Sequence, residues 1–467
     1  MINTAKLGGA LVIAWMFALV GRFLLPRVLG PDRFGDLAVT ESGVVLAMSL
    51  VAFGVGDHIS KVVSNDRTAA DTFARPIFLL QLGAGGVVTI IAAVVAGVVG
   101  GAEFAVLAAT FGVAQVATVL GRTTADYLQA IHEAGAVSAS SIVTKAIWLA
   151  VLLAGLGAGA ELLALPLALV VSEVIRTAWL LREYRRRFGT PPAAPWSAAR
   201  RVLRASIPHY ITTLNVEVLS SSTRIIVGAM GGAVAAGLFA SAAVASAVPM
   251  LLTPVLGWVA IPVLSNLRER NVEEMWTRVG SITDLLFVAC VAPSIVMFAW
   301  SDQLMDLLFG ADFELGGPAF AWLAATIPAT YFTQLVGSAY VADHREWTNT
   351  KVNLWTMLLV VVGSIGAIWL AGGDEPAVAA TWAAVVIAVG EWVTVVALIV
   401  LRPFPTLGRA TVVRAAVLAA AVVAAAVDKL GDGDVTLRVV AAALAGIVAL
   451  SDVRRVLAGL RSALGDR

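Results

Sequence analysis

Long apolar segments separated by short polar connections dominate this chain. They recur at lengths of about 18 to 25 residues, enough for a helix to cross the apolar core of a bilayer. The strand alternation of an outer-membrane barrel is absent, so the spanning elements are expected to be helices. Hydropathy, with turn residues as boundaries, predicts fourteen spans at 7–29, 37–58, 77–99, 104–128, 137–157, 161–181, 206–230, 234–264, 279–300, 316–341, 352–371, 376–400, 411–427 and 435–451.

One polar connection divides the predicted spans into groups. The segment 182–205, REYRRRFGTPPAAPWSAARRVLRA, is basic and its prolines predict a stiff linker, followed by a short basic surface helix anchored by Trp196. The span 234–264 is too long for one straight crossing, and its three prolines should kink it. We therefore predict four regions: an N-terminal lobe of six helices (1–185), a cytoplasmic linker (186–204), a C-terminal lobe of six helices (205–401), and two further helices with a tail (402–467).

Composition and charge place the chain in a membrane. It is 59% hydrophobic and 13% charged, with a mean hydropathy of +0.90, whereas about a quarter of the residues of a soluble domain are charged. With the N-terminus inside, 23 of the 32 lysines and arginines fall in inner segments and 4 in outer connections, namely Arg27, Arg33, Lys429 and Arg438. This split predicts a multi-pass protein of the cytoplasmic membrane with both termini in the cytoplasm. The net charge of +1 gives no indication of nucleic-acid binding.

A short repeat relates two places where one span turns into the next. Arg22, Gly30 and Gly35 recur 202 residues later as Arg224, Gly232 and Gly237, and Ala38 recurs as Ala240. Six spans in each group keep both groups in the same orientation. The repeat therefore predicts two parallel, structurally related lobes, each opening with a helix that carries an arginine.

Residues arranged for catalysis are scarce. The single cysteine, Cys290, lies inside an apolar segment, and none of the four histidines has an i, i+4 partner suited to a metal. A phosphate-binding Gly-Lys-Ser/Thr loop and a Gly-x-Ser-x-Gly elbow are both missing. We expect no enzymatic activity, no cofactor and no metal.

Charged residues inside the spans are the candidate functional groups. Arg122 with Asp126, and Glu173 with Arg176, have the spacing of ion pairs on one helix face, a structural role. Glu217 and Arg224 share a face but lie two turns apart, about 10 Å along the axis, too far for a direct pair. Charges without an opposite partner nearby in sequence are Arg22, Glu41, Asp57, Lys145, Asp284 and Glu391. Such charges usually face a bundle interior or a polar pathway, although Arg22 is also placed to extend toward a helix end.

Five segments resemble the polysaccharide, or Wzx-type, flippases of the multidrug/oligosaccharidyl-lipid/polysaccharide exporter superfamily, over roughly residues 5–400. They are RVLGPDRFGDLAVTES (27–42), FGVGDHISK (53–61), RIIVGAMGGAVAAGLFASA (224–242), IPVLSNL (261–267) and LFGADFELGGPAFAWLA (308–324). The family often has an acidic residue just before the second arginine, where this chain has Ser222 and Thr223. The two extra C-terminal helices are similar to those of the fourteen-helix lipid II flippases.

The resemblance implies translocation of a polyprenyl-diphosphate-linked sugar by alternating access of two lobes around a cationic cavity. Arg22, Arg224 and Lys145 are then the candidates for binding the anionic substrate, because a guanidinium suits a phosphate. The candidates for a coupling proton or sodium ion are Glu41, Asp57, Glu217, Asp284 and Glu391. The expected partners are the lipid-linked oligosaccharide, membrane lipids, and glycosyltransferases or a polymerase of the same pathway.

Two other functions stay open. A drug or metabolite antiporter of the same superfamily has the same lobes. A membrane glycosyltransferase or polymerase is the enzyme alternative, and it usually needs an active site in a sizeable outer loop. The longest outer connection, 301–317, carries four acidic residues that a solvated loop explains as well as a metal site.

Overall fold

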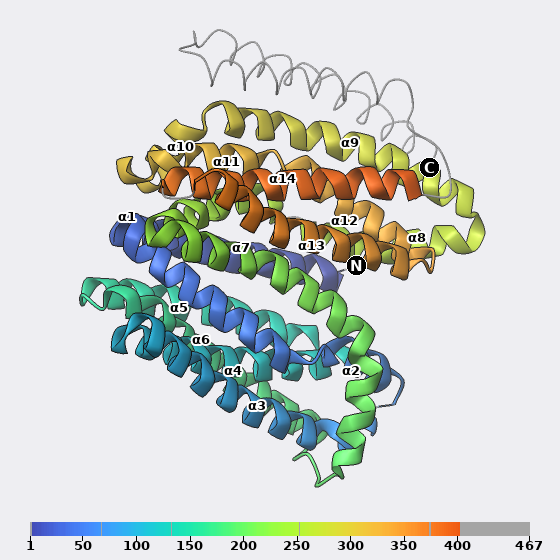
Figure 1. Ribbon diagram of the computed structural model, residues 1–467. Helices are drawn as coiled ribbons and strands as arrows, with labels where there is room; N and C mark the ends of the chain where they lie inside the picture. The colour runs from blue at the N-terminus through green and yellow to red at the C-terminus, as the bar shows by residue number, and fades with distance from the viewer. Residues whose placement is uncertain (1, 67, 132, 252, 373–374, 402–467) are drawn as a thin grey trace. The chain divides into compact units, whose positions relative to one another are not determined.

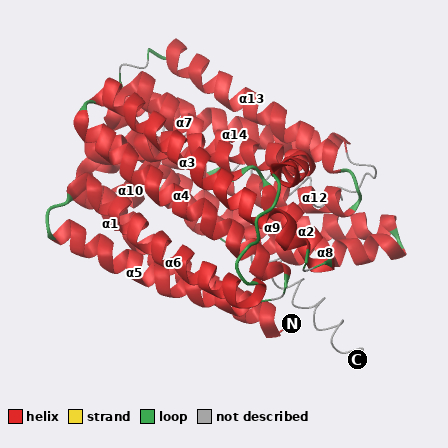
Figure 2. Cartoon of the chain, turned by 90° about the horizontal axis from the view of Figure 1, so that it is seen from below, coloured by secondary structure: helices red, strands yellow, loops and turns green. Residues whose placement is uncertain are grey.

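The computed structural model describes residues 2–66, 68–131, 133–251, 253–372 and 375–401. All regular elements of these residues are helices, joined by short loops (Figure 2). The predicted all-α class is confirmed. Within the described residues, eight helical stretches are long and apolar enough to cross a membrane, and two of them, Met16–Ala52 and Leu214–Met250, each hold the greater part of two predicted spans. The predicted spans 411–427 and 435–451 lie outside the described residues.

The chain forms two compact units that divide between Gly237 and Leu238. The first unit contains α1 (Ile2–Ala52), α2 (Val55–Asn65), α3 (Ala69–Gly100), α4 (Ala102–Ala130), α5 (Ala134–Gly157), η1 (Glu161–Leu163), α6 (Ala164–Phe188) and most of α7 (Trp196–Met250). The second contains the end of α7, α8 (Thr253–Arg270), α9 (Val272–Ala299), α10 (Ser301–Phe309), η2 (Ala311–Gly316), α11 (Gly317–Ala324), α12 (Ile327–Ala342), α13 (Glu346–Leu370) and α14 (Pro376–Leu401). The lobe boundaries proposed from the sequence stay a prediction.

Small residues hold the helices of the first unit close together. In this unit α3 packs on α4, α4 on α6, α6 on α5, and α5 on α1 (Figure 1). A Cβ added at Gly112 of α4 would overlap Thr89 of α3, and one at Gly121 would overlap Thr177 of α6. The Thr177 hydroxyl donates to the Ala117 carbonyl at 2.7 Å. Glycine and threonine let the backbones approach, which is how helices associate where no hydrophobic effect drives them.

The repeat seen in the sequence has a structural counterpart in the first unit. Gly30 interrupts α1 with φ 73° and ψ 169°, and Gly232 interrupts α7 with φ 81° and ψ 179°. A positive φ is open to glycine and strained for other residues, so each glycine marks the point where one helical stretch gives way to the next.

The two interrupted helices also meet in a reciprocal crossing. A Cβ at Gly35 would overlap the carbonyl oxygen of Ala233, and a Cβ at Gly237 would overlap the carbonyl oxygen of Pro31. Pro31 and Ala233, like Gly35 and Gly237, are 202 residues apart. Each repeat therefore places a glycine against the equivalent carbonyl of the other.

Ion pairs join the connections between helices of the first unit into two sets. Arg33, between the first two predicted spans, pairs with Glu103 at the start of α4 at 2.9 Å and with Glu161 of η1 at 3.5 Å. Arg187 near the end of α6 pairs with Glu133, just before α5, at 2.8 Å. The predicted outer connections thus lie together, as do two of the predicted inner ones.

The predicted boundaries needed correction in three places and held at the prolines of span 234–264. Span 37–58 is broken because α1 ends at Ala52 and Phe53 and Gly54 both have positive φ, after which α2 begins. The short basic helix expected after Trp196 is the first part of α7. Span 234–264 divides into the end of α7 and α8, in the region of its prolines, as expected. Span 316–341 divides into α11 and α12, where Pro328 stands in the first turn of α12.

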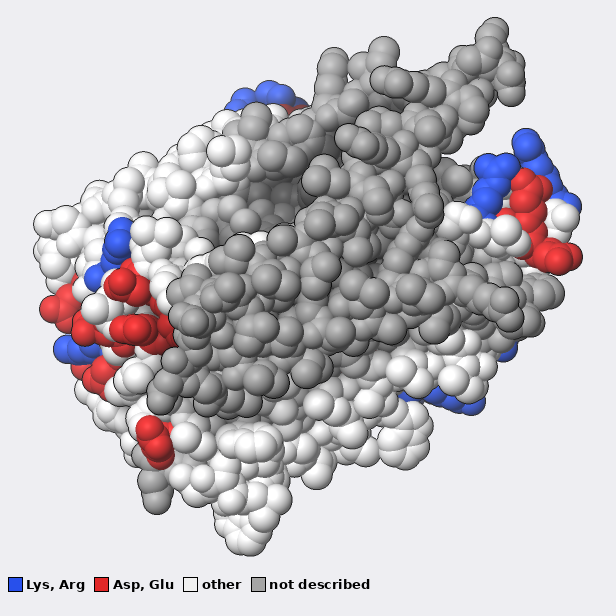
Figure 3. Space-filling model, turned by 90° about the horizontal axis from the view of Figure 1, so that it is seen from above, with Lys and Arg blue, Asp and Glu red and all other residues white. Residues whose placement is uncertain are grey.

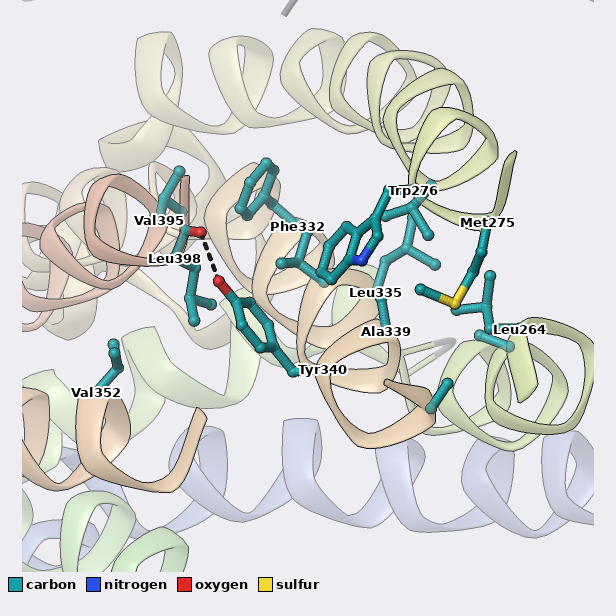
Figure 4. Close-up of a cluster of buried hydrophobic side chains, with 14 of the residues drawn as sticks. Leu264, Met275, Trp276, Phe332, Leu335, Ala339, Tyr340, Val352, Val395 and Leu398 are labelled. Carbon is teal, nitrogen blue, oxygen red and sulfur yellow. Dashed lines mark hydrogen bonds between the residues drawn. The ribbon is translucent and has the colours of Figure 1, made fainter. Parts of the chain in front are cut away.

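The second unit has an aromatic core between α8, α9, α12 and α14. Trp276 and Tyr340 meet edge to face, 5.4 Å between ring centroids, and the Tyr340 hydroxyl donates to the Leu398 carbonyl at 3.1 Å (Figure 4). On the face in Figure 3, Asp and Glu gather at the end where Figure 1 places α10. Among the described residues, no group of three or more His, Cys, Asp and Glu side chains is arranged to hold a metal ion.

Candidate functional site in the first unit

The site is built where α1 packs against α5. Gly21 of α1 lies against Trp148 and Leu152 of α5, where a Cβ would overlap the indole ring. This contact brings the next residue, Arg22, into electrostatic range of Lys145. The Lys145 ammonium also lies 5.7 Å from the centre of the Trp148 ring, a cation–π distance. The absence of a side chain at Gly21 therefore helps to place two of the predicted substrate cations together.

Arg22 has an acidic partner from the other side of the Gly30 interruption. Its Nη2 lies 3.5 Å from Oε1 of Glu41, with side-chain exposures of 47% for Arg22 and 17% for Glu41. The sequence offers Arg22 no acidic partner on its own helical stretch. The reversal at Gly30 supplies one from 19 residues along the chain.

Lys145 and Arg176 share a single carboxylate. Glu173 of α6, whose side chain is 6% exposed, lies 3.2 Å from Arg176 and 3.9 Å from Lys145. The predicted Glu173–Arg176 pair is confirmed, and Lys145 gains a partner that the sequence did not indicate. A carboxylate this deeply buried is tolerated because two cations neutralise it.

Arg224 completes the cluster, and its guanidinium forms no ion pair with a carboxylate of the described residues. It lies in the electrostatic range of Glu41, Arg22 and Glu217. It forms no ion pair or hydrogen bond with any residue that the structure describes. As the spacing predicted, Glu217 makes no direct pair with it. The charged cluster, as we call it, thus comprises four cations and three carboxylates: Arg22, Lys145, Arg176, Arg224, Glu41, Glu173 and Glu217.

The structure brings together all three predicted substrate cations and two of the five ion-coupling candidates. Glu41 and Glu217 belong to the charged cluster. Glu391 lies on α14 of the second unit and forms no ion pair or hydrogen bond with the residues described there. The side chains of Asp57 and Asp284 lie outside the described part of the structure.

A polar cavity of about 340 Å³ adjoins the charged cluster. It lies between α1, α2, α4 and α7 of the first unit, and Glu217 belongs both to its lining and to the charged cluster. Its polar lining residues are Ser49, Gln115, Thr118, Arg122, Thr123, Asp126, Gln129 and Glu217.

The sequence reasoning missed most of this cavity. The predicted Arg122–Asp126 ion pair is wrong, because Arg122 pairs with no described residue. Asp126 instead packs against Gly56 in the first turn of α2, where a carboxylate suits the helix dipole. The signal was present: Gln115, Thr118, Arg122, Asp126 and Gln129 follow helical spacing along one face of α4.

A family model described as polysaccharide biosynthesis protein matches residues 2–268. A protein of Listeria monocytogenes described as a sugar uptake protein is 29% identical over 126 residues, which cover 24% of this chain and 44% of that protein. The chain thus matches less than half the length of this curated relative.

Solved structures show the fold. An inward-facing multidrug resistance MATE family transporter of the MOP superfamily matches with a TM-score of 0.67 at 14% identity, over 89% of this chain and 99% of the other. The lipid II flippase MurJ, in an inward closed conformation, matches with 0.58 at 14% identity, over 97% and 93%. A MOP superfamily transporter from Pyrococcus furiosus matches with 0.54 at 14% identity, over 89% and 96%. At 14% identity these similarities show the fold, while the family is shown by the match over residues 2–268.

Proposed function

The chain belongs to the polysaccharide biosynthesis protein family, and from this premise we propose that it translocates a polyprenyl-diphosphate-linked oligosaccharide across the cytoplasmic membrane by alternating access. It is a multi-pass membrane protein with the fold of MOP-superfamily transporters. The proposal adds the substrate, the route and the coupling to this description.

The proposal rests on the guanidinium of Arg224, which pairs with no carboxylate among the described residues. Charged side chains within a span are costly and are retained where they contact a partner or a polar pathway. Arg22, Lys145 and Arg176 each have a carboxylate within reach, whereas Arg224 has none among the described residues. A diphosphate supplies the oxygens that a planar guanidinium binds in a bidentate manner.

The carboxylates of the cluster could couple transport of the substrate to an ion. A diphosphate at Arg224 would also attract Arg22, and would compete with Glu41 for it. A proton on Glu41 removes that competition, and a proton on either Glu41 or Glu217 offsets the negative charge that the substrate brings. A proton needs a single carboxylate, whereas a sodium ion needs several oxygen ligands, so we take a proton as the coupling ion. Proton and substrate then bind cooperatively, and each strengthens the other by the same factor.

Binding to purified protein tests this proposal. The probe is a short-chain polyprenyl diphosphate, and Arg224→Ala should weaken its binding about tenfold to a hundredfold, the loss of one charge-assisted contact. Arg224→Lys should fall between the two, because lysine keeps the charge but not the fork. The matched control is Arg278→Ala, which removes an exposed arginine of α9 that pairs with Glu274.

Two results would count against the proposal. Unchanged binding in Arg224→Ala, normalised to folded protein, would remove this residue from the site. Arg224→Ala could instead lower the amount of folded protein. If the double variant Arg224→Ala/Glu217→Gln then restores the amount of folded protein but does not restore probe binding to the same extent, Arg224 balances charge and the probe binds elsewhere. Binding of organic cations in place of the diphosphate would favour the antiporter of the same superfamily.

A further inference from the structure

We propose that the polar cavity between α1, α2, α4 and α7 binds the sugar of the substrate, next to the diphosphate on the charged cluster. This inference rests on the proposed function and deepens it. The cavity is separate from the cations singled out above, and its side chains suggest a different ligand chemistry from theirs.

The cavity carries donors and acceptors in nearly balanced numbers. Gln115 and Gln129 offer amide groups, Arg122 offers a guanidinium that pairs with no described residue, and Asp126 and Glu217 accept. One arginine against two carboxylates makes the lining slightly acidic, which disfavours a second phosphate. A volume of about 340 Å³ is too large for a bare cation. A neutral molecule whose hydroxyl groups both donate and accept matches this lining.

Several hydroxyls of the lining keep free lone pairs. The Thr118 hydroxyl donates to the Ala114 carbonyl at 2.9 Å, and the Ser49 hydroxyl donates to the Leu46 carbonyl at 2.7 Å. Each oxygen is thereby oriented and remains able to accept a hydrogen bond from a ligand. Thr123 differs, because it already accepts from the buried Gln81 amide at 2.9 Å.

Helical spacing places the cavity close enough to the charged cluster for one substrate molecule to reach both. On α1, Glu41 of the cluster shares a face with Val45, Met48 and Ala52 of the cavity. On α7, Glu217 of the cavity shares a face with Arg224. Glu41 and Met48 on α1 are seven residues apart, as are Glu217 and Arg224 on α7, which corresponds to about 10 Å at 1.5 Å per residue. A sugar attached to a diphosphate lies close to the phosphate, so one molecule can occupy both places.

The test compares a short-chain polyprenyl diphosphate with the same lipid bearing one glucose, galactose, N-acetylglucosamine or rhamnose. We expect at least one sugar to tighten binding to the wild-type protein about tenfold, the gain from one or two net hydrogen bonds. Thr118→Val and Gln115→Leu should each remove about three- to tenfold of that gain and leave binding of the bare diphosphate unchanged.

A threonine of the same helix provides the matched control. Thr110 of α4 also donates to the carbonyl four residues earlier, at 2.7 Å, but does not line the cavity. Thr110→Val should therefore change neither the bare nor the sugar-bearing probe. The bare diphosphate serves as the check that each variant is folded.

The failures of the two proposals are distinguishable. If every sugar-bearing lipid binds no tighter than the bare diphosphate, or if the cavity variants keep the full gain, the sugar site is wrong while the diphosphate site stands. If the bare diphosphate does not bind, or binds Arg224→Ala as well as the wild type, the proposed function fails and the sugar site falls with it.

Discussion

At the scale of single residues, most of the basic side chains inside the membrane spans are neutralised by an ion pair with a carboxylate. Glu41 serves Arg22, and Glu173 serves both Lys145 and Arg176. Arg224 has no such partner among the described residues and is the one best placed for an anionic ligand. The difference between paired and unpaired cations is what turns a charged cluster into a candidate binding site.

Replacing Glu41 by Gln tests whether carboxylates compete with the substrate. Glu41→Gln frees the Arg22 guanidinium, so a short-chain polyprenyl diphosphate should bind about three- to tenfold more tightly at neutral pH. The half-exposed pair contributes at most about 1 kcal/mol to folding, so the variant should stay folded. Isothermal titration of the purified variant measures the change. Weaker binding would mean that Glu41 positions Arg22 for the ligand and does not compete with it.

The pH dependence of the same binding reports on the coupling proton. If proton uptake accompanies diphosphate binding, the affinity for the diphosphate should rise as the pH falls. If Glu41 carries the proton, Glu41→Gln flattens the dependence while Glu391→Gln leaves it intact. The control matters because Glu391 lies on α14 of the second unit and is not a member of the charged cluster. A dependence lost in Glu391→Gln alone would assign the coupling proton to that residue.

Which residues would carry charge could be predicted, whereas most of their pairings could not. An i, i+3 pair such as Glu173 and Arg176 follows from helical geometry alone. Arg22 and Glu41 meet only because α1 is interrupted at Gly30, and Lys145 and Glu173 only because α5 packs on α6. The Arg122–Asp126 prediction failed because the first turn of α2 offers Asp126 a competing site.

At the scale of helices, glycines decide where segments bend and how closely they approach. The spacing of the repeat predicted equivalent turns at Gly30 and Gly232, and both have positive φ. The ends of helices were harder to predict, because apolar sequence continues across them. Residues 37–58 are mostly hydrophobic, yet α1 ends at Ala52 and α2 packs its apolar face into the cluster around Tyr127 and Tyr184.

The reciprocal crossing of α1 and α7 makes a prediction about stability. Gly35→Ala and Gly237→Ala each force a methyl group into a backbone carbonyl, which should cost about 1–3 kcal/mol and lower the Tm of the purified protein by several degrees. Gly43→Ala is the control, because a Cβ there meets nothing within 4 Å and alanine favours the helix. A Tm in either crossing variant equal to that of Gly43→Ala would show that the backbones separate without cost.

At the scale of the whole molecule, the pattern of basic residues predicts orientation. The 23-to-4 split assigns the connection before α4 to the outside and the end of α6 to the inside. In the structure the two belong to opposite sets of connections, one joined by Arg33 and the other by Arg187. The alternation of ends could be predicted because each span reverses direction. The division into lobes was not open to the same reasoning, because it depends on packing between distant helices.

Cysteine labelling in intact cells tests the orientation. In a Cys290→Ala background, Ala102→Cys should react with an impermeant thiol reagent and Arg186→Cys should not. Both positions lie at exposed helix ends, and Ala102 avoids the positive φ of Gly101. Labelling at Arg186→Cys with silence at Ala102→Cys would invert the predicted topology.

The measurement that bears most directly on the account is lipid translocation by the purified protein in vesicles. A fluorescent short-chain polyprenyl-diphosphate sugar placed in both leaflets should become fully accessible to an impermeant quencher when wild-type protein is present. Arg224→Ala, reconstituted in equal amount, should slow the initial rate about tenfold or more, and Arg278→Ala should not. Translocation by Arg224→Ala at the wild-type rate, or wild-type vesicles no faster than protein-free ones, would contradict the account.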